Sequence, residues 1–299
     1  MRLMNIHAHY DDFEFTASGT FAGFMKQSGD GVQKNGRVTI CTDGAAGHHM
    51  LSREETAATR LREQREALEV SGMNLELEVL KYPDGTIPME GQMMAEPRLM
   101  AALWNSIRGF EPDYLFCPPI PVDVSAGVHV DHLVIAESVR RVAYLINVPQ
   151  AYTNFYPEQR APFESIRTPV IVTVADSYMG AATPYDLVVD VTEHFEMICR
   201  MSWCHRSQIR EWLPWVGRHQ FRPPESFEQW KDFLEKRIVS RQQKLGLPTN
   251  RVFELFCLTA WGEIPTLEKL LHDFPSVDTV LSPIAELGRK INGWKMQGT

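Results

Sequence analysis

Two things are scarce in this chain: positive charge and long hydrophobic runs. Its 30 Lys and Arg residues are outnumbered by 38 Asp and Glu, which gives a formal net charge of −8. Because polyanions are held by a surplus of basic side chains, this balance argues against nucleic acid as a partner. No apolar stretch approaches the roughly 20 residues that span a bilayer, so we expect no membrane partner either. The composition remains compatible with a small-molecule partner.

Paired cysteines and a secretion signal are also missing. The chain has five cysteines, an odd number, none of them in a Cys-x-x-Cys pair, and most lie in apolar runs such as Leu115-Phe116-Cys117. These features predict buried free thiols in a reducing compartment rather than a disulfide framework. The N-terminus has no basic segment followed by a long apolar segment. We therefore expect a cytoplasmic protein.

Short β-rich runs alternate with helical patterns over the first two-thirds of the chain. Buried strands are predicted at residues 3–8, 37–42, 75–80, 113–117, 169–174 and 187–191. Amphipathic helices are predicted at residues 54–71, 97–109 and 193–212, and another begins near Asp131. Strands that alternate with helices indicate an α/β fold: a Rossmann-like, mostly parallel sheet flanked by helices.

The pattern changes near residue 220, where Phe221-Arg-Pro-Pro-Glu225 is typical of a turn or linker. Helices are predicted after it at residues 225–245 and 266–272. We therefore divide the chain into an α/β domain at residues 1–220 and a mainly helical C-terminal extension at residues 221–299. The pattern leaves open whether this extension is a separate subdomain or an edge of the same domain.

Two short stretches carry the residues best suited to chemistry. His7-Ala-His-Tyr-Asp-Asp-Phe-Glu14 closes the first predicted strand, and His129-Val-Asp-His132 leads into a predicted helix. Zinc binds imidazole nitrogen and carboxylate oxygen, and a catalytic zinc keeps one of its four positions open. In α/β sheets, ligands bind beyond the carboxyl ends of the strands, where both stretches are expected. Together they predict a site for one zinc ion and a hydrolytic reaction.

Each stretch also has a plainer interpretation. In the first, Asp11 and Asp12 would cap a helix, and His9 would be a hydrogen-bonded turn residue. In the second, Asp131 would be a helix N-cap beside two surface histidines. The presence of both stretches in one chain favours the metal site over these alternatives.

Both stretches resemble the signatures of a known enzyme family. The first is similar to the A-H-P-D-D-x-E motif, and the second to the H-P-D-H motif, of the LmbE/PIG-L zinc-dependent N-acetylglucosaminyl deacetylases. Weaker likenesses lie along residues 1–215: Arg60-x-x-Glu63 to an R-x-x-E helix, Tyr82-Pro-Asp-Gly85 to an F-P-D-G turn, and His205-Arg-Ser-Gln208 to an H-x-S-Q element. The resemblance implies the same α/β fold and a zinc-dependent N-deacetylase.

The resemblance also implies which residues react. The ligands of one zinc ion per chain would be His9, Asp12 and His132. Zinc lowers the pKa of bound water toward about 7, and Asp11 would act as general base on that water. His129 would be the acid or electrophilic group that stabilises the oxyanion, held in orientation by Asp131. The expected reaction is hydrolysis of an N-acyl, in particular N-acetyl, amide of an amino-sugar derivative.

Substrate contacts are expected, by the same resemblance, from Arg60, Gly127 and His205. Arg60 matches a position that binds substrate or positions active-site groups; the alternative is a solvated helix residue paired with Glu63 or Glu66. Gly127 stands where some relatives carry a substrate-facing tyrosine, so that contact is missing or supplied elsewhere. His205 would line the far side of the site, with helix packing as the alternative.

Other aromatic and imidazole side chains carry plainer predictions. Trp203, Trp212 and Trp215 fall at helical spacings, which is more typical of a core than of a sugar-binding platform. His48 and His49 lie in a loop that follows a strand, near the expected mouth of the site. We expect both histidines to be surface residues.

Two other functions stay open. One is a zinc amidase for a non-sugar amide, and the other is a catalytically silent protein that binds a small molecule. The free base Asp11 argues against the silent protein, since binding alone requires no such group. Phosphoester cleavage is disfavoured because neither a glycine-rich cradle nor a basic cluster is evident. By resemblance, a homo-oligomer is compatible with the chain.

Overall fold

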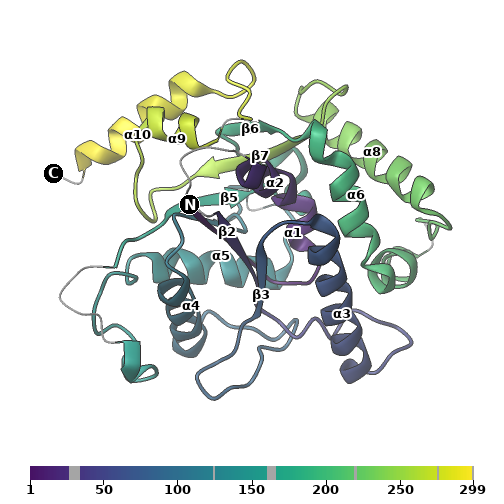
Figure 1. The fold of residues 1–299 in the computed structure, drawn as a ribbon, viewed down its shortest axis with the longest axis horizontal. Coiled ribbons are helices and arrows are strands. Elements are labelled where there is room, and N and C mark those ends of the chain that lie inside the picture. Colours follow the sequence, from purple (N-terminus) through teal and green to yellow (C-terminus); the bar gives the residue numbers. More distant parts are fainter. Residues whose placement is uncertain (27–33, 124, 160–165, 219–220, 275, 298–299) are drawn as a thin grey trace.

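The computed structural model describes residues 1–26, 34–123, 125–159, 166–218, 221–274 and 276–297. A seven-stranded sheet forms its centre (Figure 1), in the order β3-β2-β1-β4-β5-β7-β6. The strands are β1 (Arg2–His7), β2 (Asn35–Ile40), β3 (Leu75–Val79), β4 (Tyr114–Cys117), β5 (Val170–Val174), β6 (Leu187–Asp190) and β7 (Phe253–Leu258). Each of the six predicted strand ranges overlaps one of the first six strands.

Most of the sheet is parallel. β1 pairs in parallel with β2 on one side and with β4 on the other, and the parallel pairing continues from β2 to β3 and from β4 to β5. Among the described strands, β7 alone runs in the opposite direction, so its pairings with β5 and β6 are antiparallel. The predicted α/β fold with a mostly parallel sheet is confirmed.

Both faces of the sheet are buried, as is usual for parallel strands. In β4, Tyr114 and Phe116 belong to one hydrophobic cluster, whereas Leu115 and Cys117 belong to the other. The alternation follows from the two-residue repeat of a strand. All five cysteines are free thiols, and four of them are buried.

Helices cover both faces (Figure 1). α4 (Pro97–Phe110) and α5 (Val130–Ala143) pack on the face of Leu115, while α2 (Ser18–Lys26), α3 (Arg53–Ser71) and α6 (Phe195–Trp203) pack on the face of Tyr114. The shorter elements are α1 (Asp12–Thr16), η1 (Pro157–Gln159), η2 (Ser177–Ala182), η3 (Thr192–His194), the π-helical η4 (Ser207–Trp212) and α7 (Leu213–Val216). No described helix is long and apolar enough to cross a membrane.

Local sequence signals set both ends of α3. Ser52 Oγ accepts a hydrogen bond from the Glu55 amide at 3.2 Å, and the Glu55 carboxylate accepts one from the Ser52 amide at 2.9 Å. This reciprocal capping box satisfies two amides of the first turn. The helix ends at Gly72, whose φ of 66° is the left-handed conformation that glycine adopts without a Cβ clash. α3 thereby holds Arg60 at a fixed position beside the site.

The described part of the C-terminal segment contains three helices and one strand. Two of the helices overlap the predicted ranges 225–245 and 266–272, whereas the third helix and the strand were not predicted. Its helices are α8 (Phe227–Lys244), α9 (Leu267–Asp273) and α10 (Ile284–Gln297). β7 lies inside the sheet between β5 and β6. α8 packs on α6, where the buried Trp230 donates from Nε1 to Ser202 Oγ at 2.9 Å. The predicted boundary near residue 220 falls at positions 219–220, outside the described residues.

Tyr114 ties α9 to the sheet. Its hydroxyl donates to Asp273 Oδ2 at 2.5 Å, and both side chains are buried. Tyr114→Phe removes the donor and leaves the buried carboxylate with one partner fewer, so we expect the free energy of unfolding to fall by about 1–3 kcal/mol. Urea unfolding measures this loss. At the 83% exposed Tyr144, the same substitution should change the free energy by less than about 0.5 kcal/mol, and equal losses at both positions would contradict the anchoring role.

Candidate metal centre and active site

The two histidine-rich stretches meet at the carboxyl edge of the sheet. β1 ends at His7 and residues 9–12 follow it directly, while α5 begins at Val130 and carries Asp131 and His132. The strand order reverses beside β1, because β2 lies on one side and β4 on the other. Such a reversal opens a crevice at the carboxyl ends of the strands, in which ligands bind.

Three donor atoms from the two stretches face one another. His9 Nδ1 lies 3.2 Å from His132 Nε2 and 3.4 Å from Asp12 Oδ2, and His132 Nε2 lies 3.4 Å from the same oxygen. A zinc ion with bonds of about 2.0–2.2 Å and tetrahedral angles holds its ligand atoms about 3.3–3.6 Å apart. The three residues predicted as ligands therefore fit a zinc ion in both donor type and spacing.

In His9 and His132, the ring nitrogen that faces away from the three donor atoms lies next to a carboxylate. His9 Nε2 lies 3.0 Å from Asp131 Oδ2, and His132 Nδ1 lies 2.7 Å from Asp176 Oδ2. A proton on each outer nitrogen leaves the inner nitrogen free to bind a metal, and such outer partners orient metal-binding histidines. Asp176 follows β5 and was not predicted from the sequence, although its position at the carboxyl edge of a strand is a usable signal.

The expected role of Asp131 requires a correction. Its carboxylate was predicted to orient His129, but Oδ2 lies 3.9 Å from His129 Nδ1, beyond hydrogen-bond distance. The same oxygen instead bonds His9 and accepts the Gly91 amide at 2.8 Å. Asp131 thus orients a predicted metal ligand rather than the predicted acid.

The carboxylates also set the charge of the rings. Burial lowers the pKa of His9, but its hydrogen bonds with Asp12 and Asp131 outweigh burial and raise that pKa to about 10. Burial likewise lowers the pKa of His132, whereas Asp12 and Asp176 raise it to about 9. The carboxylates around His9 and His132 therefore favour positive charge at these rings at neutral pH. Either protons or a metal cation bound by the same nitrogens can provide that charge.

A further histidine, His7, joins the site and was not among the predicted residues. Its Nδ1 lies 2.6 Å from Asp12 Oδ2, its side chain is buried, and its ring packs edge-on against His132 at 4.6 Å between centroids. His7, Asp12 and His132 form a second set of donors close enough to share a cation. The signal was present in the sequence, because residues two apart at a strand end point to the same face.

Asp11 lies at the start of α1 without capping it. The helix has no side-chain capping bond, and the φ of 88° at Asp11 is a left-handed conformation that is rare for a residue with a Cβ. Burial first, and then the neighbouring Asp12, raise the pKa of Asp11 to about 7, although His205 and Arg60 oppose the shift. The helix-capping alternative for Asp11 is therefore wrong, and the carboxyl is free for chemistry.

His129 is the N-cap of α5 and borders the cavity above the donor atoms. Its Nδ1 accepts the Asp131 amide at 3.2 Å, so a neutral ring carries its proton on Nε2. Burial lowers the pKa of His129, and the nearby His9 and His132 lower it further. A neutral His129 ring would therefore present an N–H donor at Nε2.

The cavity has a volume of about 320 Å³ and reaches the donor atoms and Asp11. Arg60 lines it and is buried, with Nη2 donating to the Gly47 carbonyl at 2.8 Å and Nη1 left without a protein partner. The alternative of a solvated Arg60 paired with Glu63 or Glu66 is wrong, since Glu63 bonds Ser207 and Glu66 pairs with Arg206. Trp212 also lines the cavity, in contrast to its expected place in the core.

Two of the residues predicted to contact substrate do not reach the cavity. His205 is fully buried, 3.4 Å from Glu14 Oε1, and its neighbour Gln208 borders the cavity in its place. Gly127 is exposed in the loop before α5, and a Cβ built there would contact nothing within 4 Å. Both predictions are therefore corrected: position in a motif did not reveal which way each residue faces. Tyr178, from η2, borders the cavity on the side of His129.

The chain is similar to known proteins in sequence and in fold. Residues 4–143 match the family model described as PIG-L, GlcNAc-PI de-N-acetylase. Among solved structures, the N,N'-diacetylchitobiose deacetylase of Pyrococcus horikoshii has a TM-score of 0.63 at 20% identity, covering 96% of this chain and 88% of that one. The 4-carboxy-2-hydroxymuconate hydratase of Pseudomonas putida has a TM-score of 0.57 at 14% identity, covering 86% and 95%. None of the curated proteins that were compared matches the chain.

At these identities the solved structures establish a shared fold. A conserved protein from Thermus thermophilus also shares it, with a TM-score of 0.56 at 18% identity and coverage of 86% of this chain and 93% of that one. The residues matched by the family model run from β1 to the end of α5 and include both histidine-rich stretches. The resemblance drawn from those stretches is confirmed over residues 4–143, which match the PIG-L family model.

Proposed function

We propose that this protein is a zinc-dependent N-deacetylase that hydrolyses the N-acetyl amide of an amino-sugar derivative in the cytoplasm. The observation that carries the proposal is the triangle of donor atoms from His9, Asp12 and His132, with sides of 3.2–3.4 Å, next to the buried Asp11. The match to a de-N-acetylase family supports the reaction class. The deacetylase named among the similar folds acts on an acetylated amino sugar, which supports the substrate class.

The proposed role of each residue follows from which of its side-chain atoms have no other bonding partner. His9, Asp12 and His132 would hold one zinc ion, which acts as a Lewis acid and makes water nucleophilic near neutral pH. Asp11 has no capping role and would take a proton from the attacking water. His129, with its proton on Nε2, would donate a hydrogen bond to the amide oxygen as negative charge develops. The proton held by Asp11 then passes to the amine nitrogen as the carbon–nitrogen bond breaks. The products are the amine and acetic acid, whose remaining proton goes to solvent or to the amine at neutral pH.

The substrate would be held by groups on the cavity wall. The unpartnered Nη1 of Arg60 is a buried donor that a sugar hydroxyl or the acyl oxygen would satisfy. Trp212 offers an aromatic surface for the apolar face of a ring. Tyr178 borders the cavity near His129 and would supply the hydroxyl contact that Gly127 lacks. These groups favour an amino sugar over an unbranched aliphatic amide.

Removing the base tests the reaction. Asp11→Asn should lower kcat by at least about 100-fold, the usual contribution of a positioned general base. The measurement is acetate release from a panel of N-acetyl amino sugars and N-acyl amino compounds, with bound zinc measured by mass spectrometry in parallel. One zinc per chain is expected in both proteins, because Asp11 is not one of the proposed ligands.

The exposed Asp232→Asn on α8 is the matched control and should leave both readouts unchanged. Unchanged hydrolysis in Asp11→Asn would contradict the proposed base, and purified protein without a stoichiometric divalent metal would contradict the metal centre. A preference for non-sugar amides in the same panel would favour the amidase over the sugar deacetylase.

Asp176 should act through His132 rather than on the substrate. Its carboxylate accepts from His132 Nδ1, and loss of such a partner typically weakens metal binding by about 10–100-fold. We expect Asp176→Ala to show this loss in a zinc titration with a competing chelator, and to regain most of its activity at saturating zinc. Asp176→Asn retains a hydrogen-bond acceptor, so its zinc affinity should fall between those of the wild type and Asp176→Ala. An unchanged zinc affinity in Asp176→Ala would show that His132 does not need this partner.

A further inference from the structure

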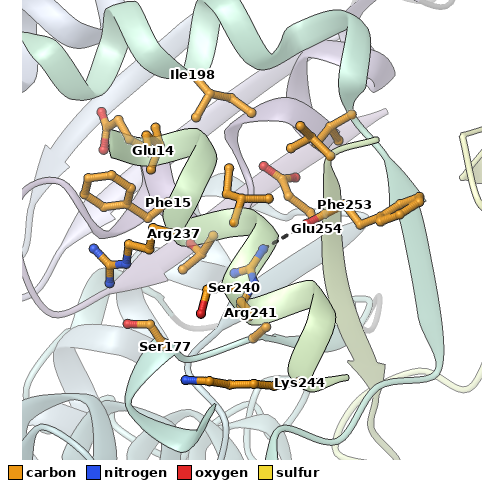
Figure 2. Close-up of a pocket in the computed structure, with 16 residues that line it drawn as sticks. Glu14, Phe15, Ser177, Ile198, Arg237, Ser240, Arg241, Lys244, Phe253 and Glu254 are labelled. Carbon is orange, nitrogen blue, oxygen red and sulfur yellow. Dashed lines mark hydrogen bonds between the residues drawn. The ribbon is translucent and has the colours of Figure 1, made fainter. Parts of the chain in front are cut away.

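A second cavity adjoins the one that contains the donor atoms. It has a volume of about 270 Å³ and lies between α1, the residues that follow β5, β7 and the side of α8 (Figure 2). The two cavities share four lining residues: Phe15, Thr16, Ser177 and Arg237. A substrate seated at the metal centre therefore has a continuation on the side of α8.

Basic side chains from one helix face line this second cavity. Arg237, Arg241 and Lys244 are four and three residues apart in α8, which places them on the same side of the helix. Figure 2 shows Arg237 and Lys244 on the side of Phe15 and Ser177, whereas Arg241 points toward Phe253 and Glu254. Among the described residues, no carboxylate oxygen lies within ion-pair distance of any of the three. Their charge is thus not neutralised by a direct partner.

Arg241 is the most enclosed of the three. Its Nη2 donates to the Phe253 carbonyl at 3.0 Å, while its Nε is buried without a partner. A buried donor without an acceptor costs free energy unless a ligand or water satisfies it. Arg241 therefore brings to the wall of this cavity a donor that no described protein atom satisfies.

The two acidic residues of the cavity accept hydrogen bonds from other groups, and the charge of Glu254 also acts on Arg241. Glu254 accepts the amides of Gly19 and Thr20 at 2.9 and 2.8 Å, and burial raises its pKa. Glu14 Oε1 accepts from Gln64 Nε2 at 2.7 Å. Glu14 also lies at the opposite end of the cavity from Lys244 (Figure 2). The end formed by Ser240 and Lys244 is therefore the positive end.

We propose that this cavity is a substrate subsite that binds an anionic group, a carboxylate or a phosphate monoester, carried by the amino sugar. The inference rests on the proposed deacetylase function and extends it to the substrate class. Arg and Lys bind such oxyanions through charge-assisted hydrogen bonds. Because the chain as a whole is negatively charged, selection of an anion must come from a local cluster of this kind.

The test compares three substrates that differ in charge: N-acetylglucosamine, its 6-phosphate, and N-acetylmuramic acid, which carries a carboxylate. The wild-type protein should show a higher kcat/KM for at least one anionic substrate than for the neutral one. The Arg237→Gln/Lys244→Gln double variant should reduce that preference by about 10–100-fold, mainly through KM, as expected for lost hydrogen bonds to a charged group. Which anion is preferred distinguishes a phosphate from a carboxylate subsite.

Lys236→Gln is the matched control. Lys236 is exposed, next to Arg237 in α8, and is not a lining residue of either cavity, so its loss should leave the preference unchanged. Should the double variant be unstable, the single Lys244→Gln at an exposed position gives the same comparison. Equal kcat/KM values for all three substrates in the wild type would overturn the subsite, as would a variant that lowers all of them by the same factor.

Binding measurements separate this inference from the proposed function. If no N-acetyl sugar is hydrolysed, the deacetylase proposal fails, but calorimetric titration with the same three compounds still tests the subsite. Tighter binding of an anionic sugar that is lost in the double variant supports the subsite. Equal affinities for charged and neutral sugars overturn it.

Discussion

One carboxylate oxygen, Asp12 Oδ2, organises the site. It lies 2.6 Å from His7 Nδ1 and 3.4 Å from both His9 Nδ1 and His132 Nε2. Burial alone would raise the pKa of Asp12, but His7 and His132 hold it well below its usual value. A buried anion surrounded by imidazoles is stable only if positive charge stays beside it. The neighbours of this oxygen come from the end of β1, the residues that follow it and α5, which meet at the carboxyl edge of the sheet.

The sequence predicted the parts of this arrangement that are local. The strands and most helices follow from apolar periodicity, and the proposed ligands follow from the resemblance of two short motifs to those of a known family. What it missed depends on long-range contacts: Asp176 meets His132 across 44 residues, and β7 pairs with strands more than 60 residues earlier in the chain. A different kind of error affected two residues that were predicted to contact substrate. Gly127 and His205 match family positions, but a motif does not specify which way a side chain faces once helices have packed.

The fold alone does not determine the reaction. A hydratase and a deacetylase are both similar in fold to this chain, so a functional argument must rest on the site. In this site Asp11 is held in a left-handed backbone conformation and left without a capping bond. Backbone strain of about 1–3 kcal/mol is retained only where the surrounding structure imposes it. In this chain it keeps a carboxyl beside the donor atoms without making it a ligand.

The family match ends at residue 143, before β5, β6, β7 and α8. Yet residues beyond that limit border both cavities: Ser177 and Arg237 line each of them, and Trp212 lines the metal cavity. The groups proposed to react thus come from the matched segment, whereas much of the surface that would meet the rest of a substrate comes from outside it. Because binding of remote substrate groups can be used to lower the barrier at the reacting bond, changes in α8 should alter catalysis as well as selectivity. Substrate preference in this protein is therefore to be sought in its C-terminal half rather than in its two histidine-rich stretches.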